Sequence, residues 1–307
     1  MIYTLTLNPS LDQHFIVKKI IKDDVVYAQQ SCLDPGGKGL NVTRVIQQLG
    51  GKSRAFTMAG GSCGKLLEEM LHQQSIHHRL YRIQGNTRTN IKITAHDGSH
   101  IQIQGQSPRL KAADIKPFFH MIEQVKPRPS YWVLAGSLPQ GITPAIYAQL
   151  IQSFHKRGEK CVLDADAEPF QHGVLAKPFL IKPNEHELQR LMGKKLMTRN
   201  QMLKAARELT RKVDIVVVTL ASKGALVVTP SESWHLTLPP VEVKSPVGAG
   251  DAFLGGFLFA LDRKESLQDA ARWAMAAATA SVRRHGTANC RHSDVLALVK
   301  RVVLKKC

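Results

Sequence analysis

The chain has 307 residues, of which 43% are hydrophobic and 21% are charged, a composition typical of a soluble globular protein with a substantial core. No apolar run approaches the length of a membrane span, and the opening Met-Ile-Tyr-Thr-Leu-Thr-Leu predicts an immediate strand instead of a signal peptide. The cysteines never occur as C-x-x-C, which argues against a disulfide framework and a zinc site. We therefore expect a cytoplasmic protein with free thiols at Cys32, Cys63, Cys161, Cys290 and Cys307.

The charge balance is strongly basic, with 42 Lys and Arg against 24 Asp and Glu and a formal net charge of +18. Such a charge is compatible with a nucleic-acid partner. However, the basic residues are dispersed, aromatic residues make up only 6%, and no recognition motif is visible. An enzyme that acts on anionic phosphates explains the charge as well, so we do not expect nucleic-acid binding to be the main function.

Short apolar runs alternate along most of the chain with amphipathic segments of helical periodicity, of which Asn41–Leu49 is an example. This alternation predicts an α/β fold with a mostly parallel central sheet covered by helices on both faces. The expected strands are Ile2–Leu7, Arg54–Met58, Tyr131–Ala135, Cys161–Asp164, Phe179–Ile181, Ile215–Leu220 and Ala225–Thr229. The last third is expected to be helical over Asp251–Leu261, Leu267–Arg283 and Ser293–Leu304, with Ser293 as the N-cap of the final helix.

Two early regions depart from this pattern, because residues 13–31 and 80–105 alternate with a period of two and carry few helix signals. They predict a small β-sheet that projects from the main body. Exposed strand edges favour pairing, so this sheet could be a lid over a pocket or a dimer contact. Without a long linker or an internal repeat, we expect residues 1–307 to form a single domain that carries this sheet as an insertion.

The strongest candidate for chemistry is Ser245-Pro-Val-Gly-Ala-Gly-Asp-Ala-Phe253, a glycine turn that runs directly into a predicted helix. The backbone N–H groups of Gly248, Ala249 and Gly250 could approach an anion closely, and the helix N-terminus adds its own donors and dipole. A carboxylate at Asp251 could take a proton from a hydroxyl while phosphate charge develops beside it. The alternative is an ordinary turn in which Asp251 caps the helix.

Four further motifs accompany this turn in order: Thr6-Leu-Asn-Pro-Ser-Leu-Asp12, Gly36-Gly-Lys-Gly-Leu-Asn-Val-Thr-Arg44, Gly136-Ser-Leu-Pro-Gln-Gly141 and Lys182-Pro-Asn-Glu-His-Glu-Leu188. With the turn, they resemble the ribokinase-like family of sugar kinases, specifically its phosphofructokinase B branch. The resemblance covers almost the whole chain. It implies a ribokinase-like fold with a β lid, a kinase activity that uses ATP and Mg²⁺, and a homodimer joined through the lid.

The resemblance also implies a role for each matching residue. Asp251 would be the catalytic base, and Gly248, Ala249 and Gly250 the anion hole. The sugar would be held by Asp12, Gly36, Gly37 and Asn41. The nucleotide side would comprise Lys182, Asn184, Thr219, Gly224 and Gly250. Asn184 and Glu187 would orient Mg²⁺ through water, and Ser245 with the Val247 carbonyl resembles the K⁺ site of some members.

The branch resembled acts on sugars that already carry a phosphate, so a second cationic site is required. Arg88 stands where the hexose-phosphate kinases keep a phosphate-binding arginine, and Ser137 and Lys38 could assist it. We therefore expect a kinase that converts fructose 1-phosphate or fructose 6-phosphate to fructose 1,6-bisphosphate. The alternatives are a tagatose-6-phosphate kinase, a kinase of an unphosphorylated sugar or nucleoside, and a non-catalytic basic binding protein. Ala221 replaces a glycine of the nucleotide loop, which leaves nucleotide preference open.

Overall fold

The computed structural model describes residues 1–284 and 286–307. Its main sheet has ten strands in the order β14-β13-β12-β11-β10-β9-β8-β1-β4-β5. These strands are β1 (Ile2–Thr6), β4 (Ser53–Ala59), β5 (His78–Arg82), β8 (Tyr131–Ala135), β9 (Lys160–Asp164), β10 (Leu180–Ile181), β11 (Ile215–Thr219), β12 (Ala225–Val228), β13 (Ser233–Thr237) and β14 (Val303–Lys306). In this spatial order, neighbouring strands pair in parallel from β5 through β4, β1, β8, β9 and β10 to β11. The remaining pairs, from β11 through β12 and β13 to β14, are antiparallel.

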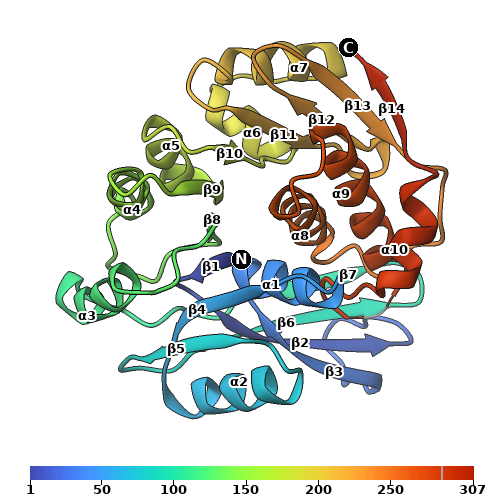
Figure 1. Cartoon of the computed structure of the whole chain (residues 1–307). Coiled ribbons are helices and arrows are strands. Elements are labelled where there is room, and N and C mark those ends of the chain that lie inside the picture. Colours follow the sequence, from blue (N-terminus) through green and yellow to red (C-terminus); the bar gives the residue numbers. More distant parts are fainter. Residues whose placement is uncertain (285) are drawn as a thin grey trace.

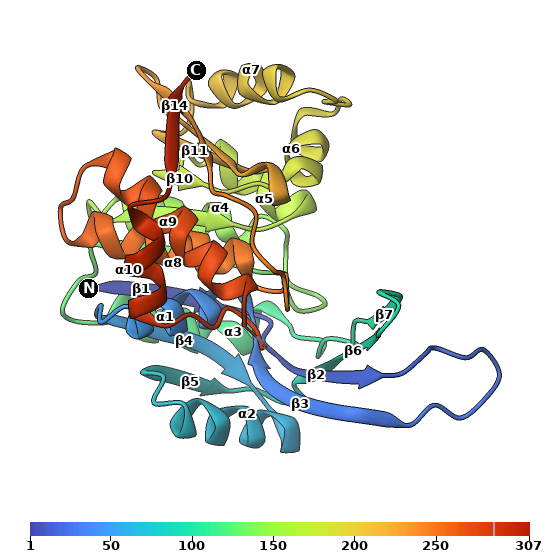
Figure 2. The same ribbon diagram turned by 90° about the vertical axis from the view of Figure 1, so that its right-hand side faces the viewer.

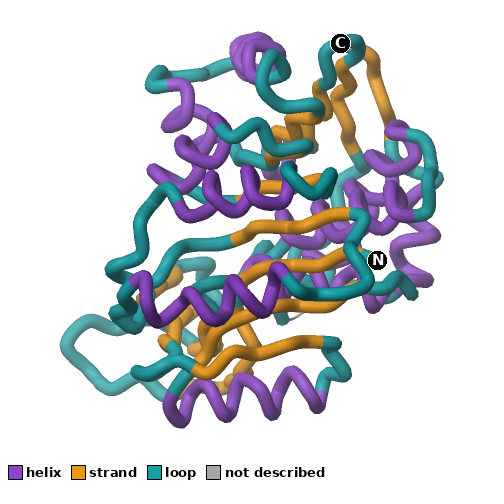
Figure 3. The backbone as a smooth tube through the Cα atoms, turned by 60° about the vertical axis from the view of Figure 1, so that its left-hand side comes forward, coloured by secondary structure: helices purple, strands orange, loops and turns teal. Residues whose placement is uncertain are grey.

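Helices cover both faces of this sheet, as the layers in Figure 3 show. One apolar cluster lies beneath α3 (Ala112–Glu123), α4 (Ile146–His155), α5 (Ala167–Leu175), α6 (Glu185–Met192) and α7 (Arg199–Leu209). A second lies beneath α1 (Lys38–Gln48), α8 (Ala249–Asp262), α9 (Leu267–Val282) and α10 (His292–Val299). A smaller cluster lies beneath α2 (Gly61–Gln73). The predicted α/β fold is therefore confirmed (Figure 1).

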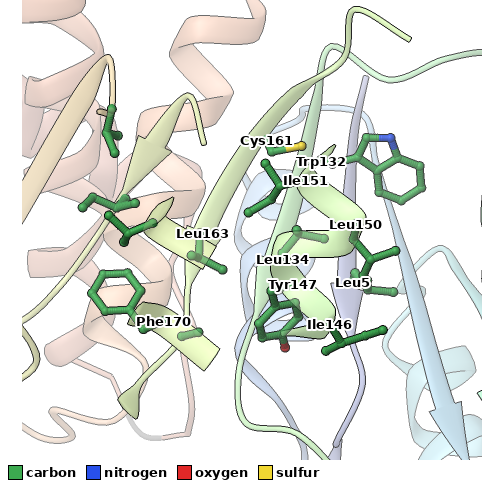
Figure 4. Close-up of a cluster of buried hydrophobic side chains, with 14 of the residues drawn as sticks. Leu5, Trp132, Leu134, Ile146, Tyr147, Leu150, Ile151, Cys161, Leu163 and Phe170 are labelled. Carbon is green, nitrogen blue, oxygen red and sulfur yellow. The ribbon is translucent and has the colours of Figure 1, made fainter. Parts of the chain in front are cut away.

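The central strands are buried because their side chains are apolar on both faces, as expected for parallel strands between two helical layers. Figure 4 shows part of the first cluster, where Leu134 and Leu163 of neighbouring strands face Tyr147 and Ile151 of α4. Trp132 stacks on Phe154 with a centroid distance of 4.7 Å. Because the carboxyl ends of the parallel strands share one edge of the sheet, side chains that follow them are brought together there.

A separate four-stranded sheet has the order β3-β2-β6-β7 and projects from the main body, as Figure 2 shows. Its strands are β2 (Ser10–Val17), β3 (Ala28–Gly36), β6 (Arg88–Ala95) and β7 (His100–Ile103). The predicted regions 13–31 and 80–105 supply these strands but with different limits. β2 and β3 extend to the motifs at Asp12 and Gly36, and residues 80–82 instead pair with β4 in the main sheet.

The prediction for the C-terminus was partly wrong. The last helix ends at Val299, and Arg291, not Ser293, is its N-cap residue. Val303–Lys306 forms β14, which pairs antiparallel with β13. Pairing with β13 overrides the local helical period there, and Val303, the first residue of β14, is β-branched and suits a strand. Across the described part of the chain, no helix is long and apolar enough to cross a membrane.

Candidate active site

The glycine turn before α8 has the geometry that its sequence predicts. Gly248 is the N-cap residue of α8 and has a φ of 78°, a left-handed backbone conformation that residues with a side chain rarely adopt. A Cβ at this position would lie 2.6 Å from the backbone nitrogen of Ala288, so glycine is required for space as well. Ala249 and Gly250 form the first turn of α8, where N–H groups lack helical acceptors and the helix dipole is positive. The turn can therefore receive an anion.

Asp251 follows in the same turn and is buried, with 7% of its surface exposed. Its carboxylate accepts a hydrogen bond of 2.7 Å from the amide nitrogen of Asn41 in α1. The Asn41 amide oxygen in turn accepts a hydrogen bond of 2.7 Å from Arg44, one turn further along α1. Arg44 can only donate, so it fixes which end of the Asn41 amide faces Asp251. Asn41, predicted to hold the sugar, thus contacts the candidate base directly.

A buried charge cluster lies next to Asp251. Asp164, the last residue of β9, is fully buried and pairs with Lys38 at 2.7 Å and with Lys182 at 3.0 Å. Burial opposes ionisation of Asp164, but the two ammonium groups outweigh it, so the pKa of Asp164 lies below its ordinary value. Lys38 also lies 3.5 Å from Glu187. The structure therefore brings together two lysines from different motifs, both beside the α8 turn.

The pKa of Asp251 is raised to about 6. Burial is the main cause, and the negative charge of Asp164 adds to it, while Lys38, Lys182 and the Asn41 hydrogen bond act in the opposite direction. A carboxylate with such a pKa is ionised at neutral pH, yet it holds a proton more strongly than an exposed aspartate. These are the properties of a general base suited to a hydroxyl substrate.

This pKa predicts the acid limb of the pH profile. A base must be deprotonated to act, so we expect kcat/KM to fall about tenfold per pH unit once the pH drops below about 6. The measurement is a pH–rate profile from pH 5 to 8 in buffers of constant ionic strength. An activity that stays constant down to pH 5 would contradict this assignment of the pKa.

Asn184 and Glu187 cap α6. The Asn184 side-chain oxygen accepts a hydrogen bond from the backbone nitrogen of Glu187. The Glu187 carboxylate in turn accepts one from the backbone nitrogen of Asn184, and both bonds are 2.8 Å long. The second carboxylate oxygen of Glu187 faces Lys38. Mg²⁺ usually keeps several waters and binds phosphates with one or two carboxylates. This pair fits such an outer, water-mediated role better than direct coordination.

Asp12 lies where β2 of the small sheet approaches the main body. Its carboxylate accepts hydrogen bonds from Ser10 at 2.7 Å and from Asn90 at 2.8 Å. A Cβ on Gly36 would collide with this carboxylate, and Gly37 has a φ of 132°, so the glycine pair is required for the approach. A cavity of about 70 Å³ lies beside Asp12. Its lining includes Asp12, Asp34, Asn90, Lys92, Ser245, Val247 and Thr287.

Ser245 and Val247, the predicted K⁺ ligands, therefore line this cavity together with residues of the small sheet. Ser245 is buried, and its backbone nitrogen donates to the Val282 carbonyl at 3.1 Å. The Val247 carbonyl accepts a long hydrogen bond of 3.4 Å from the Ala288 nitrogen. A carbonyl oxygen has two lone pairs, so Val247 retains capacity to coordinate a cation.

Arg88, the predicted phosphate ligand, makes only long hydrogen bonds. Its guanidinium donates to the Asn8 carbonyl at 3.3 Å and to the Ser137 hydroxyl and the Gln104 side chain at 3.4 Å each. Among the described residues, its buried Nε atom has no acceptor. Burial also lowers the pKa of Arg88 from its usual value. A half-buried guanidinium with unused donor capacity is well suited to an anionic group. Ser137 lies beside it as predicted, whereas Lys38, also predicted to assist Arg88, pairs with Asp164 and Glu187.

The two predicted nucleotide-loop residues flank a short 3₁₀ turn, η1 (Ala221–Lys223). Thr219 ends β11 and pairs with Asn184, whereas Gly224 follows the turn with a φ of 93°. A Cβ on Gly224 would collide with the Leu236 carbonyl, so this glycine is required for packing. Ala221 has a φ of 49°, in the left-handed region that favours glycine. The alanine noted in the sequence therefore stands at a strained position.

The comparisons with known proteins agree with this arrangement. Residues 7–294 match the model of the pfkB family carbohydrate kinases. The chain belongs to this family. It is 33% identical to the ATP-dependent 6-phosphofructokinase isozyme 2 of Escherichia coli over 95% of this chain and 96% of that protein. It is 31% identical to the 1-phosphofructokinase of Vibrio cholerae over 93% of this chain and 90% of that one.

Solved structures give the same result for this pfkB kinase. Escherichia coli phosphofructokinase-2 in complex with substrates and products superposes with a TM-score of 0.92 at 30% identity, covering 97% of this chain and 98% of that chain. Arabidopsis thaliana ribokinase has a TM-score of 0.78 at 22% identity, over 97% of this chain and 98% of that chain, a likeness of fold. The predicted family, the ribokinase-like fold and the kinase class are therefore confirmed.

Asp164, Asp34 and Asn8 were not singled out as site residues in the sequence. Asp164 had a usable signal, because it ends an apolar strand at the sheet edge where ligands bind in parallel α/β folds. Asp34 lines the cavity beside Asp12, and burial raises its pKa. The Asn8 amide donates to Ser107 and Ser137 and so arranges the surroundings of Arg88. Asn8 had a signal too, because it lies in the motif Thr6–Asp12, in the bend between β1 and β2. Asp34 had none, since the pairing of β3 with β2 brings it opposite Asp12.

Proposed function

We propose that this kinase transfers the γ-phosphoryl group of ATP to a fructose phosphate, either fructose 1-phosphate or fructose 6-phosphate, and forms fructose 1,6-bisphosphate. The observation that carries the proposal is the buried Asp251 carboxylate at the N-terminus of α8, with Lys38 and Lys182 close by. The relatives named 6-phosphofructokinase and 1-phosphofructokinase support the substrate class. They leave open which fructose phosphate is the acceptor.

In the proposed mechanism, Asp251 accepts the proton of the attacking sugar hydroxyl, and the Asn41 amide holds the carboxylate in position. The backbone N–H groups of Gly248, Ala249 and Gly250 stabilise the charge that develops on the transferring phosphoryl group. Lys182 lies near this turn, since a Cβ on Gly250 would be 3.1 Å from its ammonium nitrogen. Mg²⁺ bound with ATP would neutralise phosphate charge, oriented by Asn184 and Glu187 through water.

On the sugar side, Asp12 and the backbone at Gly36 and Gly37 hold hydroxyl groups in this proposal, and Arg88 with Ser137 binds the phosphate that the substrate already carries. On the nucleotide side, Thr219 and Gly224 shape the ATP loop. Ser245 and the Val247 carbonyl hold a K⁺ ion, a proposal favoured by the Escherichia coli phosphofructokinase-2 structure in complex with potassium. Addition of K⁺ is then expected to raise turnover.

We further propose that residues 1–307 act as one kinase domain in the cytoplasm, with the small sheet as a lid that limits ATP hydrolysis by water. The sheet and its loop expose Val25, Tyr27, Ile101 and Ile103, which favours a homodimer joined through the lid. Escherichia coli phosphofructokinase-2 has a tetrameric inhibited form, so a higher assembly is a competing outcome. Analytical ultracentrifugation with and without Mg·ATP distinguishes these states.

The proposal is tested by ADP release from Mg·ATP in the presence of K⁺. The acceptors are fructose 1-phosphate, fructose 6-phosphate, tagatose 6-phosphate, free fructose, ribose and adenosine at one concentration. We expect strong turnover on one fructose phosphate. Preference for tagatose 6-phosphate would support the tagatose-6-phosphate kinase instead, and preference for a free sugar or adenosine would overturn the phosphosugar class. Inactivity combined with salt-sensitive RNA or DNA binding would favour a non-catalytic basic protein.

Arg88→Met is expected to raise KM for the sugar phosphate about ten- to hundredfold while KM for ATP stays within about twofold. A hydrogen bond to a charged group is worth about 1.5–3 kcal/mol, and the variant removes the charge but keeps most of the side-chain volume. Steady-state kinetics with each substrate varied separately measures the effect. Arg211→Met, at an exposed position after α7, is the matched control. An unchanged KM for the sugar phosphate would remove Arg88 from the phosphate site.

A further inference from the structure

A second cluster of metal-binding side chains lies at the outer edge of the main sheet. Glu68 and His72 are one helical turn apart on α2, and His78 is the first residue of β5, the edge strand. The three side chains offer ligand atoms that all lie within 4.8 Å of one another. Ligands of tetrahedral Zn²⁺ at about 2.1 Å stand about 3.4 Å apart, so modest side-chain rotations would bring these atoms onto one ion.

The His78 ring is already oriented for coordination. Its Nδ1 atom lies 2.8 Å from the Ile76 carbonyl oxygen. A carbonyl can only accept a hydrogen bond, so Nδ1 carries a proton, and Nε2 is the atom of the neutral ring that can bind a metal. A backbone carbonyl that fixes the tautomer of a ligand histidine is a common feature of metal sites. The His72 ring packs edge-to-face against this ring with a centroid distance of 4.7 Å, so the two imidazoles are direct neighbours.

The Glu68 carboxylate is held by an ion pair with Arg82, the last residue of β5. This contact occupies Oε2 and leaves Oε1 available as a ligand. The positive charge of Arg82 weakens cation binding, but the ion pair also fixes the position of the carboxylate. An open groove of about 520 Å³ adjoins the two histidines and gives access to solvent, so water can complete the coordination.

We propose that Glu68, His72 and His78 form a binding site for a divalent transition-metal ion of the Zn²⁺ type, separate from the active site. Two imidazoles and one carboxylate suit Zn²⁺, whereas Mg²⁺ and Ca²⁺ prefer oxygen ligands alone. The cysteine spacing of this chain speaks only against a cysteine-based zinc site, whereas these ligands are two histidines and a glutamate. Because the ligands come from α2 and β5, the bound ion would cross-link the helix to the edge strand and stabilise this part of the fold.

The test is isothermal titration calorimetry of the EDTA-treated, dialysed full chain with Zn²⁺, together with the visible spectrum of bound Co²⁺. We expect one Zn²⁺ per chain at this site. The variants His72→Ala, His78→Ala and Glu68→Gln are each expected to weaken its binding at least about tenfold, since even residues behind the ligands matter by about 10–100-fold. His77→Ala is the matched control, because His77 lines the same groove but is not one of the three proposed ligands.

Three further readouts make the result decisive. The affinity should fall on acidification, because metal ligands must be deprotonated to bind the ion. Thermal unfolding should shift upward with Zn²⁺ for the wild type and His77→Ala but not for His78→Ala. A Co²⁺ spectrum with sulfur-to-metal charge transfer would assign the ion to a cysteine and overturn the proposal. Absence of binding, or equal binding in His78→Ala and the wild type, would overturn it as well.

Discussion

Replacement of Asp251 by asparagine is expected to lower kcat by about 10²–10⁴-fold, with the dissociation constants of both substrates within about threefold of wild type. An amide cannot accept the hydroxyl proton, but its oxygen can still accept the hydrogen bond from Asn41. The side chain keeps its size, so the buried turn should remain folded. Steady-state kinetics and calorimetric titration of the sugar phosphate measure the two effects.

The matched control is Asp262→Asn at the opposite end of the same helix, where the carboxylate pairs with the N-terminal ammonium at 3.0 Å. This variant should retain kcat within about twofold, because Asp262 is remote from the glycine turn. If Asp251→Asn kept more than about a tenth of wild-type turnover, the base would have to be another group.

Replacement of Asp164 by asparagine is expected to lower the free energy of unfolding by about 3–5 kcal/mol. Asp164 is fully buried and pairs with both Lys38 and Lys182, so the variant takes the counter-ion from the buried Lys182 and leaves Lys38 with only Glu187 at 3.5 Å. Urea denaturation monitored by circular dichroism measures the loss. Asp166→Asn is the control, because that carboxylate is exposed and its ion pair with Arg190 should contribute less than about 1 kcal/mol.

Asp164→Asn is also expected to change the pH dependence of kcat/KM. The charge of Asp164 raises the pKa of Asp251, so its removal should lower that pKa. The acid limb of the kcat/KM profile should then move below its wild-type position near pH 6. A merely structural role for Asp164 would reduce stability without moving this limb. A shift of the limb to higher pH would contradict the proposed coupling.

The sequence predicted the layers of the fold because its strands and helices carry strong local patterns. Ile215–Thr219 is uniformly apolar up to its last residue, and the Gly248 turn needs glycine both for its φ and for space. The limits of the small sheet and the identity of β14 were not predictable in this way. They depend on pairing with distant strands, as in the contact of Leu304 with Leu236 across β13 and β14.

The candidate site was predicted as a set of motifs, but its electrostatics were not. Asp164 gains its importance only when folding places it between lysines that are 144 positions apart in the chain, Lys38 and Lys182. Likewise, the raised pKa of Asp251 follows from burial and a neighbouring charge. The sequence shows which residue types are present, whereas desolvation and charge proximity arise from the tertiary structure.

Identification of the product is the decisive test of the proposed phosphofructokinase activity. The wild-type protein is incubated with Mg·ATP, K⁺ and either fructose 1-phosphate or fructose 6-phosphate, and the reaction is followed by ³¹P nuclear magnetic resonance. We expect the signals of ADP and fructose 1,6-bisphosphate to grow in equal amounts with one of the two acceptors. Consumption of ATP without a bisphosphate, or no turnover on either acceptor by folded protein, would contradict the proposed function.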